Sequence, residues 1–337
     1  MRIWIAATAM ALTLAAGAAK AQTADYAYGA DIGWVTQEEA QGFVFRDAAG
    51  QKADPFVLLK NLGVNAIRLR VWVDPEGGWN GKADTLAKAK RAMAQGQRVM
   101  IDFHYSDNWA DPGKQFKPKA WTGDSEAQLE QHIYDHTVDV LSYLKANGVT
   151  VSWVQVGNEI TNGLLWPDAK VKDGDTKHWA NLTAMTNRGY DAVKAVYPDA
   201  QVVIHIDNGW DTAKAKGWFE NFFANSGKVD IIGLSYYPAY SPTKDWKQEN
   251  PHLGQTMGEL FELYHKPIMV VEIGFAADKP HEARLMIADV IKRNQMLGDK
   301  GQGVFYWEPD SPGPMHYPLG AMTDDGRFTV AMDAFKH

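Results

Sequence analysis

The sequence contains no cysteine. Disulfide frameworks, cysteine nucleophiles and thiolate metal sites are therefore all excluded. Positive charge is also scarce, because 34 lysines and arginines stand against 41 aspartates and glutamates, which gives a formal net charge of -7 at pH 7. A chain with this balance presents no basic footprint for nucleic acid or for an anionic membrane surface. We therefore expect neither of these partners, and a neutral or basic partner fits better.

Long hydrophobic runs are missing as well, since the apolar stretch from Ile3 to Ala16 is too short to cross a membrane. Arg2 precedes this stretch and the small-x-small sequence Ala19-Lys-Ala21 follows it, which is the pattern of a cleaved secretory signal. A buried N-terminal helix, the alternative, would show an amphipathic period that this segment lacks. We expect residues 1–21 to be a signal peptide, residues 22–337 to form one domain, and the mature protein to be secreted or periplasmic.

Apolar and aromatic side chains are abundant, at 45% and 12% of the 337 residues. A chain of this size and composition buries a large core, as one big domain or two ordinary ones. Strand-like apolar runs alternate with helical segments along it, and no linker interrupts them. The expected strands are residues 28–34, 66–73, 98–105, 151–159, 202–208, 229–238, 268–275 and 303–309.

Helical segments separate these strands. After the sixth strand we expect a loop, residues 239–251, followed by a helix that ends at Tyr264. Eight strand and helix alternations predict an α/β fold of the (β/α)8 TIM-barrel type in a single domain. A doubly wound open sheet is the main alternative, but the Gly-rich phosphate-binding turn after its first strand is missing here. The other expected helices are residues 53–62, 83–95, 125–146, 179–196, 218–224 and 280–296.

Polar and aromatic residues stand at the carboxyl ends of the predicted strands, where several buried apolar runs end abruptly. In a barrel these ends converge on one face, and that face carries the chemistry of barrel enzymes. A carboxylate at the end of a buried strand is costly unless a partner or a reaction compensates it. The residues at such ends are Asp31, Arg70, His104, Glu159, Asp207, Tyr237, Glu272 and Trp307.

Glu159 and Glu272 end two of these strands and suit the cleavage of a glycosidic bond. That reaction needs one protonated acid for the leaving oxygen and one ionised group as nucleophile or base. Arg70 or Arg68 would keep Glu272 ionised, whereas an apolar surrounding would raise the pKa of Glu159. The alternative is that both glutamates only form internal ion pairs.

Further residues at these ends are expected to bind a sugar chain. Loop tryptophans offer flat apolar faces for sugar rings, and Asp, Asn and His side chains bind hydroxyl groups. The alternation within residues 229–238 favours Tyr237 over Tyr236 as the residue that points inward. The expected substrate-binding residues are Asp31, Arg70, His104, Asp107, Trp109, Asn158, Trp166, Asp207, Asn208, Tyr237, Trp246 and Trp307.

A metal site is the rival interpretation of some of these residues, since Asp102, His104, His205 and Asp207 are of metal-binding types. The spacing argues against it, because no His-x-His or His-Glu-x-x-His run occurs. We therefore expect no metal and no cofactor.

Sequence blocks throughout the chain resemble glycoside hydrolase family 53, the arabinogalactan endo-β-1,4-galactanases. The resemblance implies a retaining catalytic barrel with Glu159 as acid/base, Glu272 as nucleophile, and their carboxyl groups about 5–5.5 Å apart. It implies the β-1,4-galactan of pectin or of type I arabinogalactan as substrate, and we expect a monomer. The blocks are Gly29-Ala-Asp31, Arg68-Leu-Arg-Val-Trp-Val-Asp74-Pro75, Asp102-Phe-His-Tyr-Ser-Asp107, Trp109-Ala-Asp-Pro112, Gln155-Val-Gly-Asn-Glu159-Ile, Leu165-Trp166-Pro167, Ser235-Tyr-Tyr-Pro238 and Tyr306-Trp-Glu-Pro309.

Two other functions stay open. A mannanase or cellulase would share both glutamates and differ in its loops. A sugar-binding barrel without activity would not depend on Glu159 and Glu272, whereas an enzyme loses orders of magnitude of rate without them.

Overall fold

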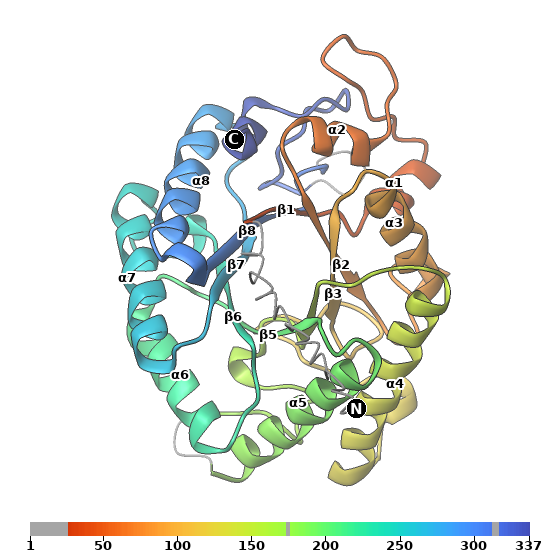
Figure 1. Ribbon diagram of the computed structural model, residues 1–337, viewed down its shortest axis with the longest axis vertical. Coiled ribbons are helices and arrows are strands. Elements are labelled where there is room, and N and C mark those ends of the chain that lie inside the picture. Colours follow the sequence, from red (N-terminus) through yellow and green to blue (C-terminus); the bar gives the residue numbers. More distant parts are fainter. Residues whose placement is uncertain (1–25, 173–175, 312–316) are drawn as a thin grey trace, which may run out of the picture.

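The computed structural model describes residues 26–172, 176–311 and 317–337. Within them, eight parallel strands pair in sequence order, and β8 closes the barrel against β1 (Figure 1). The predicted (β/α)8 fold is confirmed. The signal-peptide prediction concerns residues 1–21, which lie outside the described residues. The strands are β1 Ala27–Asp31, β2 Ala66–Val71, β3 Arg98–Phe103, β4 Trp153–Val156, β5 Gln201–Ile206, β6 Ile231–Tyr236, β7 Ile268–Ile273 and β8 Gly301–Trp307.

Helices surround the barrel on its outside (Figure 1). None of those in the described part of the chain is long and apolar enough to span a bilayer. The helices are α1 Val35–Ala40, α2 Pro55–Asn61, α3 Lys82–Ala94, α4 Glu126–Ala146, α5 Thr176–Val196, α6 Thr212–Ala224, α7 Trp246–Tyr264 and α8 Pro280–Gln295. Short 3₁₀ helices lie at Glu76–Gly78, Lys119–Trp121, Ile160–Asn162, Pro238–Tyr240, Gly298–Lys300 and Val330–Phe335.

The interior of the barrel is divided into an apolar layer and a polar layer. Successive side chains of a strand point to opposite faces, so residues of one parity line the interior. In β2 the inward residues start with buried Ala66, which belongs to an apolar cluster with Met100 and Phe305, and continue with Arg68 and Arg70. The same strands therefore close one end of the barrel with apolar side chains and present polar ones at their carboxyl ends.

β7 departs from this alternation. Met269 and Val271 belong to the apolar inner cluster, so regular alternation would turn Glu272 outward. The register with both neighbouring strands shifts within β7, and Ser235 of β6 pairs with Glu272 where one more Val would be expected. An extra residue of this kind is a β-bulge, which re-aims the following side chain. The bulge turns Glu272 toward the carboxyl end of the barrel.

Two helices begin earlier than predicted. α6 begins at Thr212 instead of residue 218, because the Asp211 side chain accepts a hydrogen bond from the Lys214 N–H and caps it. α7 begins at Trp246, inside the expected loop 239–251, and contains Pro251. The prediction of a loop up to residue 251 was wrong, because the Asp245 side chain caps a helix that begins more than one turn before Pro251.

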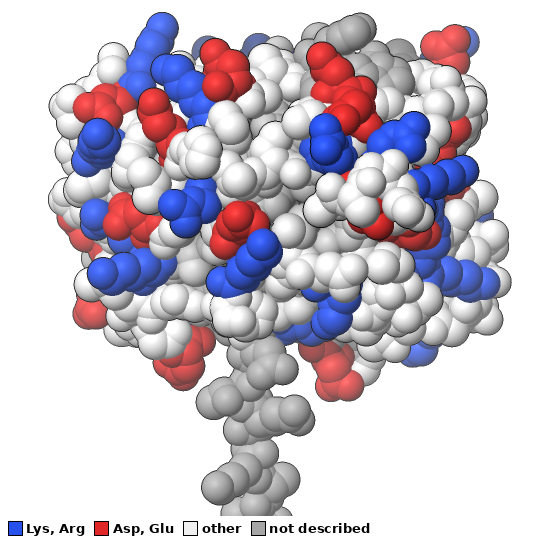
Figure 2. All heavy atoms as spheres, turned by 90° about the horizontal axis from the view of Figure 1, so that it is seen from above, with Lys and Arg blue, Asp and Glu red and all other residues white. Residues whose placement is uncertain are grey.

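The surface carries both charge signs. On the side of the barrel shown in Figure 2, lysine and arginine side chains are interspersed with aspartates and glutamates. The net charge of -7 is thus not gathered into one patch on this side.

Candidate active site

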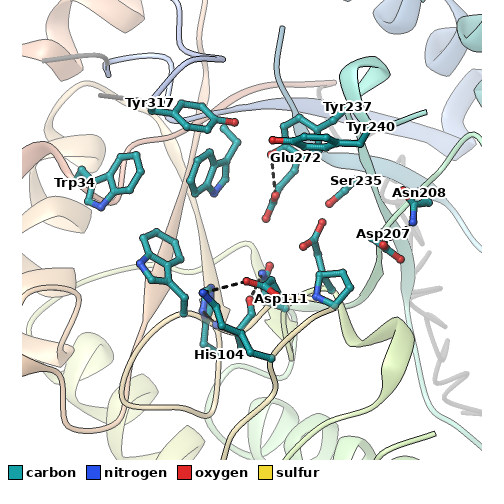
Figure 3. Close-up of a pocket in the computed structure, with 17 residues that line it drawn as sticks. Trp34, His104, Asp111, Asp207, Asn208, Ser235, Tyr237, Tyr240, Glu272 and Tyr317 are labelled. Atoms are coloured by element: carbon teal, nitrogen blue, oxygen red, sulfur yellow. Dashed lines mark hydrogen bonds and ion pairs between the residues drawn. The ribbon is translucent and has the colours of Figure 1, made fainter. Parts of the chain in front are cut away.

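A cleft of about 560 Å³ opens at the carboxyl ends of the strands (Figure 3). Trp34 and Tyr317 lie on one side of it, and Asp207 and Asn208 lie on the other, with Glu272 between them. The lining residues are Trp34, His104, Trp109, Ala110, Asp111, Pro112, Lys114, Asn158, Glu159, Asp207, Asn208, Ser235, Tyr237, Tyr240, Glu272, Trp307 and Tyr317.

Glu159 reaches the cleft because the chain turns sharply after β4. Gly157 has a φ of 86° and Glu159 a φ of 45°, so the strand ends in the left-handed region of the backbone. A non-glycine residue there costs of the order of 1 kcal/mol and more, and such residues concentrate at functional sites. The backbone N–H of Glu159 donates to Nδ1 of His205 over 3.3 Å, which fixes the turn.

The two carboxyl groups of the cleft have different partners. Arg68 Nη1 lies 2.9 Å from Oε1 of Glu272, and the Tyr237 hydroxyl donates to Oε2 over 2.9 Å. Glu159 has no arginine among these contacts, and its side chain hydrogen-bonds to Ser235. Glu272 therefore has two groups in direct contact that favour its charged form, whereas Glu159 has the Ser235 hydrogen bond and a smaller effect of the Arg68 charge.

The different environments affect the pKa values of Glu159 and Glu272 differently. Burial raises the pKa of Glu159 well above its ordinary value, and the charge of Glu272 raises it further. Burial also raises the pKa of Glu272, to about 7, against the opposing effect of Arg68. Because the two carboxyls interact, their titration belongs to the pair. The arrangement favours a proton on Glu159 and a negative charge on Glu272.

A buried polar network under the cleft holds Arg68 in place. Its guanidinium contacts Asp31 Oδ2 at 2.6 Å, Asp102 Oδ2 at 2.9 Å and Asn158 Oδ1 at 2.8 Å. Asn158 in turn donates through Nδ2 to the Ala110 carbonyl over 2.8 Å. Fully paired buried charges of this kind rigidify a site. The network fixes the residue before Glu159 and the cation beside Glu272 together.

Both histidines of the site are held in one tautomer by their neighbours. His205 Nδ1 accepts the Glu159 N–H, so Nε2 carries the proton and donates to Ser235 Oγ over 2.7 Å. Burial lowers the pKa of His205 well below its ordinary value, so the ring is neutral. His104 Nδ1 accepts from Trp72 Nε1 over 3.1 Å, which leaves Nε2–H to donate to Asp102 over 3.0 Å. The rival metal interpretation does not fit nitrogens engaged in this way.

Aromatic rings form one wall of the cleft. Trp34 contacts Trp109 and Trp307 edge to face, with centroids 5.5 and 5.2 Å apart. Tyr317 packs on Trp307 at 4.6 Å. Tyr240 is 67% exposed and lies 5.8 Å from Tyr237. Such faces suit the apolar side of a sugar ring.

Nine of the fourteen residues selected from the sequence line this cleft. These are Glu159, Glu272, His104, Trp109, Asn158, Asp207, Asn208, Tyr237 and Trp307. The alternation argument for Tyr237 is confirmed, since Tyr236 turns away and donates to Asn250.

Asp31 and Arg70 do not line the cleft but lie buried beneath it, at 0% and 1% exposure. Both side chains are covered by their neighbours in this structure, so their burial does not favour the expected contact with substrate, which stays a prediction. The prediction that Arg68 or Arg70 accompanies Glu272 resolves in favour of Arg68.

Three other selected residues lie outside the cleft lining. Asp107 accepts the N–H groups of Asp74 and Lys119, so its carboxylate connects the loops after β2 and β3. Trp166 stands beside Phe116 and donates to the Asn162 carbonyl. Trp246 is the first residue of α7 and packs on the core. The expected substrate contact of Trp246 rested on a loop that is in fact a helix.

Other cleft residues were missed. Trp34 and Tyr317 follow β1 and β8, and Ser235 precedes the tyrosine pair of β6. Trp34 carried a usable signal, since it is the last residue of the first expected strand, residues 28–34. Tyr317 and Tyr240 carried none, because both lie beyond strand ends at distances that only the fold defines.

Comparisons with known proteins agree on one family. The profile of glycosyl hydrolase family 53 matches residues 27–317. A probable arabinogalactan endo-β-1,4-galactanase A of Aspergillus terreus is 34% identical, over 83% of this chain and 84% of the relative. The arabinogalactan endo-β-1,4-galactanase of Cellvibrio japonicus is 32% identical, over 90% of this chain and 86% of the relative. A solved fungal β-1,4-galactanase superposes with a TM-score of 0.83 at 29% identity, over 92% of this chain and 98% of that one.

Proposed function

Since the chain belongs to glycosyl hydrolase family 53, and is therefore a glycoside hydrolase, we propose that it cleaves internal β-1,4-galactosidic bonds of galactan with retention of configuration. The substrate would be the galactan of pectin or of type I arabinogalactan. The observation that carries the proposal is the pairing of two glutamates in one cleft with unequal partners, Arg68 and Tyr237 on Glu272 and neither on Glu159.

The reaction runs in two displacements. Glu272 attacks the anomeric carbon while Glu159 gives its proton to the departing glycosidic oxygen, which leaves a glycosyl ester on Glu272. Glu159, now ionised, takes a proton from water, and this water breaks the ester. Negative charge leaves Glu272 as the ester forms, and Arg68 and Tyr237 stabilise it when it returns.

The remaining cleft residues would bind the chain. Asn158 is fixed by Arg68 and Ala110, and the second N–H of its amide is free to donate to a sugar hydroxyl beside the reacting carbon. The tryptophan wall would take sugar rings on the side of Trp34, and Asp207 and Asn208 would bind hydroxyls on the opposite side.

Release of reducing ends from potato galactan tests the substrate. We expect strong release from galactan, and little from mannan, xylan or cellulose. Release from mannan or cellulose but not from galactan would overturn the assignment in favour of another barrel glycosidase. Binding of galactan without any hydrolysis would point to a sugar-binding protein. Proton NMR during the first turnovers tests retention, which requires that new reducing ends appear first as the β anomer.

Export and oligomeric state are part of the same proposal. Removal of residues 1–21 would release the mature enzyme to the polymer, and N-terminal sequencing of the protein recovered outside the cytoplasm should start at Gln22. We propose that the enzyme acts as a monomer. Light scattering should give the mass of one chain at concentrations used for assay.

A further inference from the structure

Arg70 is a buried cation without a catalytic partner. It is 1% exposed, does not line the cleft and stands two residues after Arg68 on the same inner face of β2. Its Nη1 bonds Oε1 of Glu308 and lies 3.6 Å from Oδ1 of Asp31. Its Nε and Nη2 have no hydrogen-bond partner among the described residues, although buried donors are nearly always paired.

Indole rings take the place of the missing acceptors. The guanidinium carbon lies 4.3 Å from the ring centroid of Trp109, 5.2 Å from that of Trp34 and 5.6 Å from that of Trp72. An arginine over a ring face within about 6 Å is attracted by the ring quadrupole, and more strongly where water is excluded. Two of these rings, Trp34 and Trp109, also line the cleft.

Glu308 connects Arg70 to the carboxyl ends of β1 and β8. It follows Trp307 with a φ of 48°, and its own N–H donates to the Asp31 carbonyl over 2.8 Å. Its Oε1 takes Arg70, and its Oε2 accepts the backbone N–H of Trp34 over 3.4 Å. One carboxylate therefore connects the loop after β1, the strand β2 and the end of β8.

The side chains around the ion pair of Arg70 and Glu308 are closely packed. A Cβ on Gly33 would stand 2.2 Å from Arg70 Nη1, so the loop after β1 comes this close only because residue 33 is a glycine. Trp307 meets Trp34 at 5.2 Å and Trp109 at 5.8 Å between centroids. A shift of the guanidinium would therefore move three cleft-lining rings, Trp34, Trp109 and Trp307.

We propose that Arg70 and Glu308 are positioning residues that set the arrangement of the tryptophan wall, and through it the affinity for the sugar chain. The inference rests on the proposed function, because the wall needs a sugar chain to bind. The two neighbouring arginines then have different roles, since Arg68 serves the carboxylate that reacts and Arg70 serves the rings that hold the substrate.

The test uses Arg70→Lys and Glu308→Gln in the full-length enzyme. Lysine keeps the charge and thereby the field on Asp31, but its compact ammonium does not cover flat ring faces. Glutamine keeps the shape of Glu308 and weakens its bond to Arg70. Arg91→Lys is the matched control, since Arg91 lies over Phe56 at 4.6 Å, pairs with Glu39 and Asp54, and does not line the cleft.

We expect KM for galactan to rise by about tenfold in Arg70→Lys and Glu308→Gln, with kcat within about twofold and an unchanged pH profile of kcat. The control should keep both constants. A merely structural role would lower the amount of active enzyme, hence kcat, and leave KM in place. Tryptophan fluorescence titrated with galacto-oligosaccharides should show the same loss of affinity.

Unchanged KM in both folded variants would overturn the inference, and so would a fall in kcat with a shifted pH profile, which would assign Arg70 to Glu272 instead. If Arg70→Lys fails to fold, Glu308→Gln decides alone, because it weakens the same contact with an isosteric side chain. Absence of galactan cleavage by the wild type is a separate result, which would refute the proposed function.

Discussion

The guanidinium of Arg68 lies 2.9 Å from Oε1 of Glu272, and the same group is held by Asp31 at 2.6 Å and Asp102 at 2.9 Å. Arg68 is fully buried and Glu272 is 5% exposed, so water screens their attraction little. Arg68 favours the negative charge on Glu272. Glu159 has no hydrogen bond to an arginine within the described residues, so the position of this one cation distinguishes the two carboxyl groups of the cleft.

Arg68→Lys should therefore lower kcat/KM by about 10²–10³. A lysine carries a point charge and cannot serve Glu272, Asp31 and Asp102 with a planar fork. The pKa of Glu272 should rise, so the acidic limb of the rate profile should move to higher pH. Rates between pH 4 and 9, with circular dichroism to establish folding, check this, and an unmoved acidic limb in a folded variant would contradict it.

Tyr237→Phe removes the hydroxyl that donates to Oε2 of Glu272. This bond favours the ionised carboxyl, so its loss should shift the acidic limb in the same direction as Arg68→Lys, with about a tenfold loss in kcat. Tyr236→Phe is the control, because its hydroxyl donates to buried Asn250 away from the cleft. The control should cost about 1 kcal/mol of stability and leave the pH profile unmoved. Equal shifts in both variants would show that Tyr237 acts through packing alone.

Azide should distinguish the roles of Glu159 and Glu272. In Glu159→Ala an aryl galactoside with a good leaving group still forms the ester, and azide needs no general base to break it, so the rate should recover and yield β-galactosyl azide. In Glu272→Ala azide replaces the nucleophile from the opposite face and should yield α-galactosyl azide. Product configuration is read by NMR. The opposite pairing of anomers would exchange the two assignments.

Glu38→Gln should change how stability depends on pH. Glu38 is fully buried, and neither of its carboxyl oxygens has a hydrogen-bond partner in the part of the chain that the structure describes. Burial raises its pKa to about 8, and Glu308 adds to the rise. Its carboxyl binds a proton more tightly in the folded state than in the unfolded one. Stability is therefore fully present below the unfolded pKa of 4.5 and falls as pH rises toward 8.

Glutamine stays neutral at every pH. The free energy of unfolding of the variant should therefore rise relative to that of the wild type between pH 5 and 8, by an amount of the order of a few kcal/mol at pH 8. Urea unfolding at the two pH values measures the difference. Glu39→Gln is the control, since Glu39 is exposed and pairs with Arg91. A wild type that keeps the same stability at pH 5 and pH 8 would refute the prediction.

The sequence was sufficient for the barrel because its strands are long apolar runs at regular spacing, and Arg68 and Arg70, two residues apart, share one face of β2 as strand alternation requires. It was also sufficient for the position of Glu159, which ends a strand that has no other use for a carboxylate. Glu272 was selected for the same reason, although strict alternation with Met269 and Val271 would have turned it outward. Only the register shift in β7 turns Glu272 toward the cleft. The position of a β-bulge cannot be recognised in a run of apolar residues.

The remaining differences concern features that the sequence does not show, such as how deeply a side chain is covered and where a helix begins. Arg70 was expected at the substrate because it ends a strand, yet the loop with Trp34 and the ring of Trp109 cover it. Trp246 was expected in the loop 239–251, yet α7 begins at Trp246 and contains Pro251. Tyr317 lies after the last strand and joins the cleft through contacts that only the fold creates, with Trp307 and Trp34.

The division of the barrel interior into an apolar and a polar layer restricts how this enzyme can adapt to heat. Replacing a buried ion network by apolar side chains of similar volume often stabilises a protein. Here the charged layer also holds the side chains that carry the reaction. Replacing it by apolar side chains would therefore give a more stable barrel without activity. Gains in thermal tolerance without loss of turnover must then come from elsewhere, such as the outer helices, the loop lengths and the surface charges.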